Sequence, residues 1–147
     1  MPVRVTSFRR AEPLSAEPFD IVVLDADARH LRRKRITLAH GEDVLVDFAQ
    51  AVQLADGDRL VLEDGREARV VAADEALMEV RARDPRHLLQ LAWHIGNRHL
   101  PAEIREDRIL LRRDPVIRRM LEGLGAETRE ITSPFQPEHG AYHAHPH

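Results

Sequence analysis

The dipeptide Asp-Pro occurs twice in the second half of the chain, and each time it precedes a helical pattern of apolar residues. Asp84-Pro85 is followed by such a pattern up to Ile95, and Asp114-Pro115 by a similar one up to Leu124. An aspartate side chain can accept hydrogen bonds from the free amides of a first helical turn, and proline at the first helical position loses no bond. The two dipeptides therefore predict two short helices.

Alternating apolar and polar residues, which are typical of strands, surround both predicted helices. Segments 76–82, 100–106, 108–113 and 126–132 show this pattern, and a tight polar turn joins the middle two. The resulting order is β-α-β-β-α-β, which is the ferredoxin-like arrangement. We expect this domain to span residues 74–133.

The first half of the chain shows strand patterns and no convincing helix. Alternating apolar residues flank the sequence HGED at residues 40–43, and a second pair of alternating runs flanks Asp64-Gly65. Asp-Gly between such runs is a strong hairpin signal, because both residues tolerate a positive φ. With a further strand at residues 20–25, we predict a small all-β domain over residues 1–73. The fold class is therefore α+β.

Composition excludes several classes of function. The chain contains no cysteine, which excludes a disulfide framework, a thiolate nucleophile and a cysteine-rich zinc module. A net charge of −3 gives no general attraction to nucleic acid or to anionic membranes. No secretory apolar segment and no run near the roughly 18 apolar residues of a membrane span are found. We expect a cytoplasmic protein that binds neither nucleic acid nor membranes.

Four of the nine histidines lie in the last nine residues of the chain. The segment from residue 134 to 147 is rich in proline, glycine and histidine, so we expect a flexible tail. Neutral imidazole nitrogens bind late first-row divalent metals. The tail therefore predicts metal capture by His139, His143, His145 and His147.

His99 allows two interpretations. If the first helix continued to residue 99, His99 would extend its apolar stripe and be partly buried, whereas Gly96 and Asn97 favour an earlier helix end with His99 on the surface. One imidazole holds a metal poorly, but two copies brought together across a two-fold axis can begin a site. His94 lies five residues before His99, which is about 140° around an ideal helix. This is not the i, i+4 spacing that lets two histidines of one helix bind the same ion. We therefore expect a structural or supporting role for His94.

The sequence HIGNRHLPAEI, residues 94–104, resembles the H-L-G-N-R-H motif and following strand of the UreE urease accessory proteins, which are nickel metallochaperones. Residues 56–80 and the final PFQPEHGAYHAHPH support the resemblance, which covers most of the chain from about residue 20. It implies an N-terminal β domain that binds protein partners or peptides, and a C-terminal domain that dimerises head to head. It also implies that His99 and its symmetry mate bind one Ni²⁺, with ligands added by the tail.

The same resemblance implies delivery of nickel to the urease apoprotein with the accessory GTPase UreG, and no enzymatic activity. Cu²⁺ or Zn²⁺ can bind such ligands in vitro. Trp93 stands where the family commonly has tyrosine, and residues 112–115 replace a peripheral His-x-His pair of some members, so no such site is expected.

Two alternative functions remain. One is passive nickel storage or sensing. The other is a metal-dependent hydrolase, which we rank low because the chain lacks a carboxylate–histidine motif. The chain also contains a basic cluster of four residues, Arg32, Arg33, Lys34 and Arg35. Three interpretations of this cluster remain open: it binds a phosphate, it binds an acidic partner, or it is a solvated loop or strand edge with no binding role.

Overall fold

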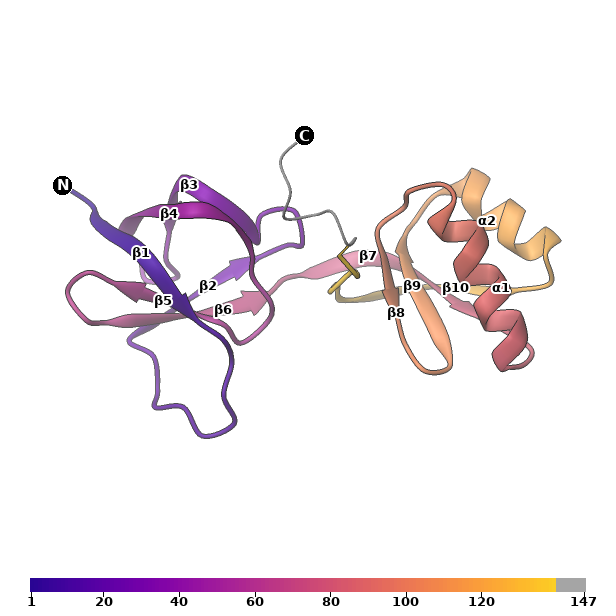
Figure 1. Ribbon diagram of the computed structural model, residues 1–147, viewed down its shortest axis with the longest axis horizontal. Helices are drawn as coiled ribbons and strands as arrows, with labels where there is room; N and C mark the ends of the chain where they lie inside the picture. Colours follow the sequence, from indigo (N-terminus) through magenta and orange to yellow (C-terminus); the bar gives the residue numbers. More distant parts are fainter. Residues whose placement is uncertain (140–147) are drawn as a thin grey trace. The chain divides into compact units, whose positions relative to one another are not determined.

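The computed structural model describes residues 1–139, which fall into two compact units that meet between Ala73 and Asp74 in the sequence (Figure 1). The first unit contains only strands, and the second contains strands and two helices. The predicted α+β class, with an all-β unit followed by a β-α-β-β-α-β unit, is confirmed.

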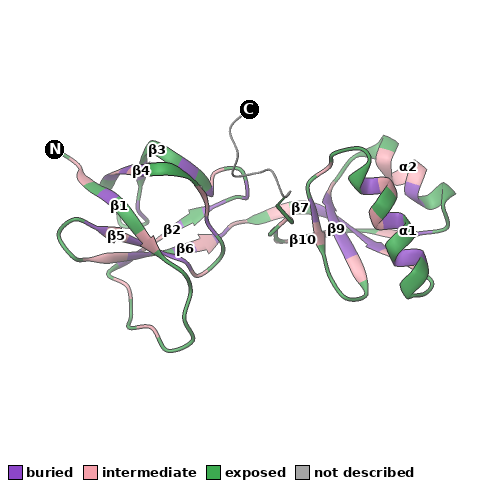
Figure 2. Cartoon of the chain, viewed as in Figure 1, coloured by how far each residue is buried: buried purple, intermediate pink, exposed green. Residues whose placement is uncertain are grey.

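The first unit is a six-stranded sheet with the order β2-β6-β5-β1-β4-β3. Its strands are β1 (Val3–Arg9), β2 (Asp20–Leu24), β3 (His30–Thr37), β4 (Asp43–Gln53), β5 (Arg59–Leu62) and β6 (Glu67–Ala72). β1 pairs parallel with β4, and β2 pairs parallel with β6. Valine and leucine side chains from all six strands fill its core, as the buried segments in Figure 2 show.

Both predicted hairpins of the first unit are present. Gly41, with φ of +100°, lies in the turn between β3 and β4. Gly65, with φ of +93°, lies in the turn between β5 and β6. A side chain at either position would be strained, because left-handed backbone favours glycine. Strand β1, which lies between β5 and β4 in the middle of the sheet, carried no sequence signal that we recognised.

The second unit is a four-stranded antiparallel sheet with the order β10-β7-β9-β8 and two helices. Its elements are β7 (Asp74–Arg81), α1 (Pro85–Gly96), β8 (Ala102–Ile104), β9 (Arg108–Arg112), α2 (Pro115–Gly123) and β10 (Glu127–Pro134). Both helices begin at the predicted prolines. The Asp84 carboxylate accepts the amide of His87, and Asp114 accepts the amides of the second and third residues of α2.

The helices cover one face of this sheet. Leu88, Leu91 and Ile95 of α1 and Leu121 of α2 belong to one buried cluster with residues of β7 and β9. The outer faces of both helices are largely exposed (Figure 2). Burial of one apolar stripe per helix supplies most of the stability of such short helices.

We expected residues 134–147 to form a flexible tail, but this segment begins with the last residue of a strand and a buried aromatic ring. Residue 134 is the last residue of β10, and the ring of Phe135 is fully buried. His139 is the last described residue, and the predicted ligands His143, His145 and His147 lie outside the described residues. Within residues 1–139, neither helix has the length and apolar character that crossing a membrane requires.

Candidate metal-binding site

His99 lies just beyond the end of α1, with its side chain exposed. The helix ends at Gly96, Asn97 caps it, and the amide of His99 donates to the carbonyl of Gly96 at 3.1 Å. His99 has φ of +55°, and it is the one non-glycine residue with positive φ among residues 1–139. The surface position is thus confirmed. Continuation of the apolar stripe to His99 is wrong, because the helix stops one residue after Ile95.

His94 is half-buried in the last turn of α1. Its ring meets the ring of Trp93 edge to face, with 5.1 Å between centroids and 85° between planes. Because α1 ends between His94 and His99, the two imidazoles do not share a helix face, and the structural or supporting role of His94 stays a prediction. Over the described part of one chain, no group of three or more histidine, aspartate or glutamate side chains could hold a metal ion.

His139 begins the histidine tail close to the connection that carries His99. The amide of the preceding residue, Glu138, donates to the carbonyl of Ala102 at 2.7 Å. Ala102 is the first residue of β8 and lies only three positions after His99. The fold thus brings the start of the tail and the α1–β8 connection to the same corner of the sheet.

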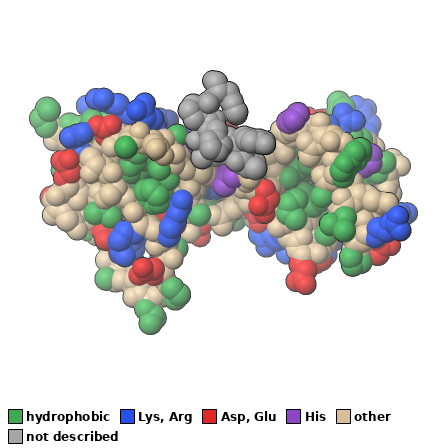
Figure 3. Space-filling model, in the orientation of Figure 1, with side chains coloured by type: hydrophobic (Ala, Val, Ile, Leu, Met, Phe, Trp, Pro, Cys, Tyr) green, Lys and Arg blue, Asp and Glu red, His purple; other side chains and the backbone are tan. Residues whose placement is uncertain are grey.

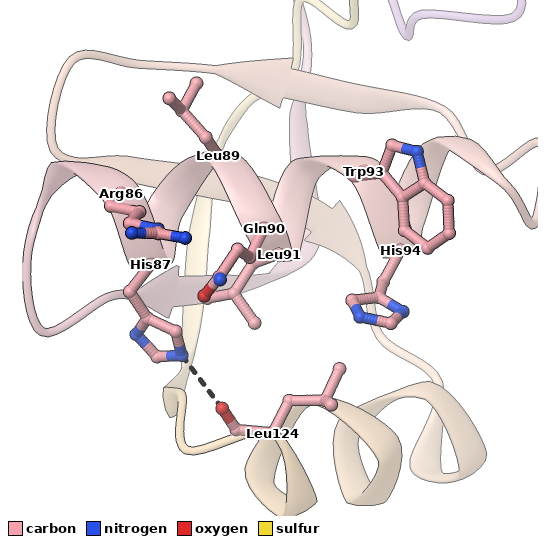
Figure 4. Close-up of a pocket in the computed structure, with 8 residues that line it drawn as sticks. All are labelled: Arg86, His87, Leu89, Gln90, Leu91, Trp93, His94 and Leu124. Atoms are coloured by element: carbon pink, nitrogen blue, oxygen red, sulfur yellow. Dashed lines mark hydrogen bonds between the residues drawn. The ribbon is translucent and has the colours of Figure 1, made fainter.

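The outer face of α1 carries two large exposed apolar side chains beside the polar Arg86 and Gln90. Leu89 is 72% exposed and Trp93 is 65% exposed, on successive turns of the helix. These side chains border a groove of about 590 Å³, which is shown in Figure 4. The groove is lined by Arg86, His87, Leu89, Gln90, Leu91, Trp93, His94 and Leu124. Large exposed apolar side chains that gather on one face are typical of interaction surfaces.

His87, which we did not predict to have a role, connects the start of α1 to the end of α2. Its ring is 3% exposed. Nδ1 accepts the amide of Arg83 at 3.0 Å, and Nε2 donates to the carbonyl of Leu124 at 2.8 Å (Figure 4). Both ring nitrogens are therefore engaged within the protein. No sequence signal marks this role, because the Leu124 carbonyl is 37 positions away.

The basic cluster, Arg32 to Arg35, lies on β3, an edge strand of the first unit. All four side chains are exposed, and none forms a salt bridge within the described residues. Lys and Arg side chains gather over this strand in Figure 3. A hydrogen bond from Arg4, with the charges of Arg33 and Arg32, lowers the pKa of Asp47 on the neighbouring strand. A cationic edge strand is also a common defence against pairing with other chains.

Comparison with known proteins covers both units. The sequence model described as UreE urease accessory protein, N-terminal domain, matches residues 5–73, and the corresponding C-terminal domain matches residues 75–147. The urease accessory protein UreE of Rhizobium meliloti is 53% identical over 147 residues, which are 100% of this chain and 96% of that protein. Urease accessory protein UreE 1 of Brucella suis is 56% identical over 94% of this chain and 85% of its own length.

Proposed function

Since the chain belongs to the UreE family of urease accessory proteins, we propose that it binds Ni²⁺ through histidines at a homodimer interface and delivers it to apo-urease. The family consists of accessory chaperones and not of enzymes. The observation that carries the proposal is the position of His99, an exposed imidazole directly after a helix that exposes Leu89 and Trp93 on its outer face.

The exposed apolar face of α1 supports an interface with a second copy of this chain. In the proposed dimer, a two-fold axis passes near the C-terminal turn of α1. Each copy then buries Trp93 of its partner, because an isologous interface uses the same surface of both copies. Burial of two tryptophan and two leucine side chains is the kind of apolar contact that anchors such interfaces. The same axis brings His99 of one copy close to His99 of its partner, which makes a pair of nitrogen ligands.

Histidines of the tail complete the coordination in this proposal. His139 is near the His99 connection, and His143, His145 and His147 follow it along the chain. Neutral imidazoles suit Ni²⁺, and the absence of thiolate avoids a very tight closed zinc site. Cu²⁺ and Zn²⁺ can occupy the same ligands in vitro, so selectivity comes from metal supply and from partner proteins.

Delivery requires that the ion also leaves. Tail ligands can leave one at a time and open coordination positions for the ligands of an acceptor. We assign the acceptor to the urease maturation complex, with the accessory GTPase UreG as the intermediate partner and the cytoplasm as the location. The first unit, residues 1–73, is the part that we propose to contact protein partners.

Nickel titration by calorimetry, combined with analytical ultracentrifugation, tests this function. We expect His99→Ala to abolish the tight site while the dimer persists through the apolar face. A full-length variant with His139, His143, His145 and His147 changed to alanine is expected to bind less nickel per dimer and to remain dimeric. If His99→Ala binds nickel with wild-type affinity and stoichiometry, the interface site is wrong.

A passive nickel store or sensor is the second candidate, because such a protein would bind the same ions through the same histidines. Urease activity in a strain that lacks this protein separates the two. A carrier is expected to restore urease activity at limiting nickel, and the His99→Ala variant is not. If the protein is a store that never contacts the urease assembly, neither the wild type nor the His99→Ala variant restores urease activity.

A further inference from the structure

One face of the sheet in the second unit is buried although the helices do not cover it. Leu77 on β7 is 0% exposed and Leu110 on β9 is 2% exposed. Side chains alternate between faces along a strand, so both point away from the face that carries Met78 and Leu111, which pack with the helices. Their burial therefore requires cover from outside the helical layer.

Phe135 supplies apolar cover on this face. Ile131 of β10 pairs with Leu77 of β7. Because every second side chain along a strand points to the same face, Phe135 points to the same face as Ile131. The Phe135 ring is fully buried, and the guanidinium of Arg112 lies 5.2 Å from its centroid. Arg112 is itself the β9 partner of Leu77. The ring thus lies on the same face as these residues.

The backbone then crosses to the opposite edge of the sheet. The amide of Gln136 donates to the Glu103 carboxylate at 2.8 Å, and the amide of Glu138 donates to the carbonyl of Ala102 at 2.7 Å. Both acceptors are on β8, whereas the segment starts from β10 at the other edge. Three strand spacings are about 14 Å, which four extended residues can span. In Figure 1 the yellow segment after β10 lies near the start of β8. We call residues 135–138 the C-terminal strap.

We propose that Phe135 is a positioning residue for metal binding: it anchors the C-terminal strap and so fixes the start of the histidine tail beside the His99 connection. This inference rests on the proposed function. Phe135 has no metal-binding atom and acts only through the tail. With the strap in place, His143 is five residues from the last anchored amide, that of Glu138.

Release of the strap changes the geometry of the tether. The tail would then start at Pro134, on the far edge of the sheet, and nine residues would separate it from His143. The effective concentration of a tethered ligand falls with tether length and with distance between its ends. We expect release to weaken nickel binding by roughly threefold to tenfold, because the tail imidazoles then meet the His99 site less often.

The test uses Phe135→Ala in the full-length protein, with nickel affinity measured by calorimetry. The expected result is the weaker binding given above, with an unchanged dimer in ultracentrifugation. Phe135→Leu keeps an apolar anchor and is expected to restore most of the affinity. Phe19→Ala, in the first unit and 37% exposed, is the matched control and is expected to bind nickel like the wild type. Wild-type affinity in Phe135→Ala overturns the proposal.

A second background separates positioning from general damage to the fold. In the full-length variant with the four tail histidines changed to alanine, Phe135→Ala is expected to cause no further loss of nickel affinity. An equal loss in that background means that Phe135 acts on His99 through the fold, and the proposal fails. Should Phe135→Ala not fold, Glu103→Ala removes another strap contact and is judged by the same comparison.

The proposed function fails by a different result. If His99→Ala and the tail variant both bind nickel like the wild type, the site itself is misplaced, whatever Phe135 does. If both weaken binding and Phe135→Ala does not, only the role of the strap is refuted.

Discussion

His99 combines an exposed imidazole with a left-handed backbone conformation, φ of +55°. A non-glycine residue in this region carries strain of about 1 kcal/mol or more, which the surrounding structure must offset. Gly96 and Asn97 before it explain why the helix stops and why the chain turns here. Backbone strain at an exposed, chemically versatile side chain is consistent with a functional position.

Two substitutions at this residue separate strain from chemistry. His99→Gly and His99→Ala both remove the imidazole, so we expect equal loss of nickel binding. Only glycine relieves the left-handed strain, so we expect His99→Gly to be about 1 kcal/mol more stable than His99→Ala in urea unfolding. Equal stability of the two variants would show that the turn is not held as the structure has it.

His87 and His94 are a matched pair on α1 with opposite expectations. His87→Ala leaves the amide of Arg83 and the carbonyl of Leu124 without partners, so we expect it to lower the free energy of unfolding by about 2–4 kcal/mol. His94→Ala removes only a ring contact and is expected to cost less than about 1 kcal/mol. Urea unfolding followed by fluorescence of Trp93, the single tryptophan, measures both in the second unit. Similar losses would contradict these assignments.

The sequence allowed the surface position of His99 to be predicted as one of two options, because glycine and asparagine before it signal a helix end. The role of His87 could not be predicted. Its ring nitrogens bind one local amide and one carbonyl from α2, and the second contact exists only once the helices pack. His139 was predicted as a ligand from composition. Its proximity to the α1–β8 connection follows from the bond between the Glu138 amide and the Ala102 carbonyl, which joins segments far apart in the sequence.

At the scale of elements, β7 contains a buried carboxylate. Glu79 is 4% exposed, and Arg81, Arg108 and Arg129 lie within 3.4 Å of its oxygens. The hydrogen bond from Arg81 is the main cause of a lowered pKa for Glu79, and the charges of all three arginines contribute. A carboxylate with a lowered pKa in the folded state stabilises the protein above its unfolded pKa. This stability is lost as the pH falls through the folded pKa.

We therefore expect Glu79→Gln to be less stable than the wild type at pH 7 by about 1 kcal/mol, because its arginine partners are partly exposed and screened. The difference is expected to shrink once the pH falls below the ordinary pKa of glutamate, roughly 4.3, because the carboxylate of the unfolded chain is protonated first. It is lost as the pH falls further, through the lowered pKa of Glu79 in the folded protein. Unfolding by urea at several pH values measures it. A difference that stays constant from pH 7 to pH 3 would rule out this ion network.

Element order in the second unit was predictable because two Asp-Pro caps and period-two strands mark it clearly. β1 was not, although it is central in its sheet. Val3 and Val5 alternate towards the core, but a shift of register between Val5 and Ser7 makes Phe8, not Ser7, the next inward residue. Such a bulge breaks the alternation on which a strand prediction depends.

At the scale of the whole molecule, the proposed function requires two copies of the chain that meet through the outer face of α1. We expect Trp93→Glu to weaken the dimer at least about tenfold, because it places a charge at the centre of the apolar face. Val116→Glu is the matched control: Val116 is equally exposed, at 65%, but does not line the groove. Sedimentation equilibrium of both variants measures the effect. A monomeric wild type, or equal effects of the two substitutions, would contradict this interface.

The most direct test of the central claim is a crystal structure of the nickel-loaded protein, with the ion located by its anomalous scattering. We expect a nickel ion on a two-fold axis, bound by His99 of both copies and by at least one histidine of a tail. A nickel ion held by tail histidines alone, with the two His99 rings apart, would contradict it.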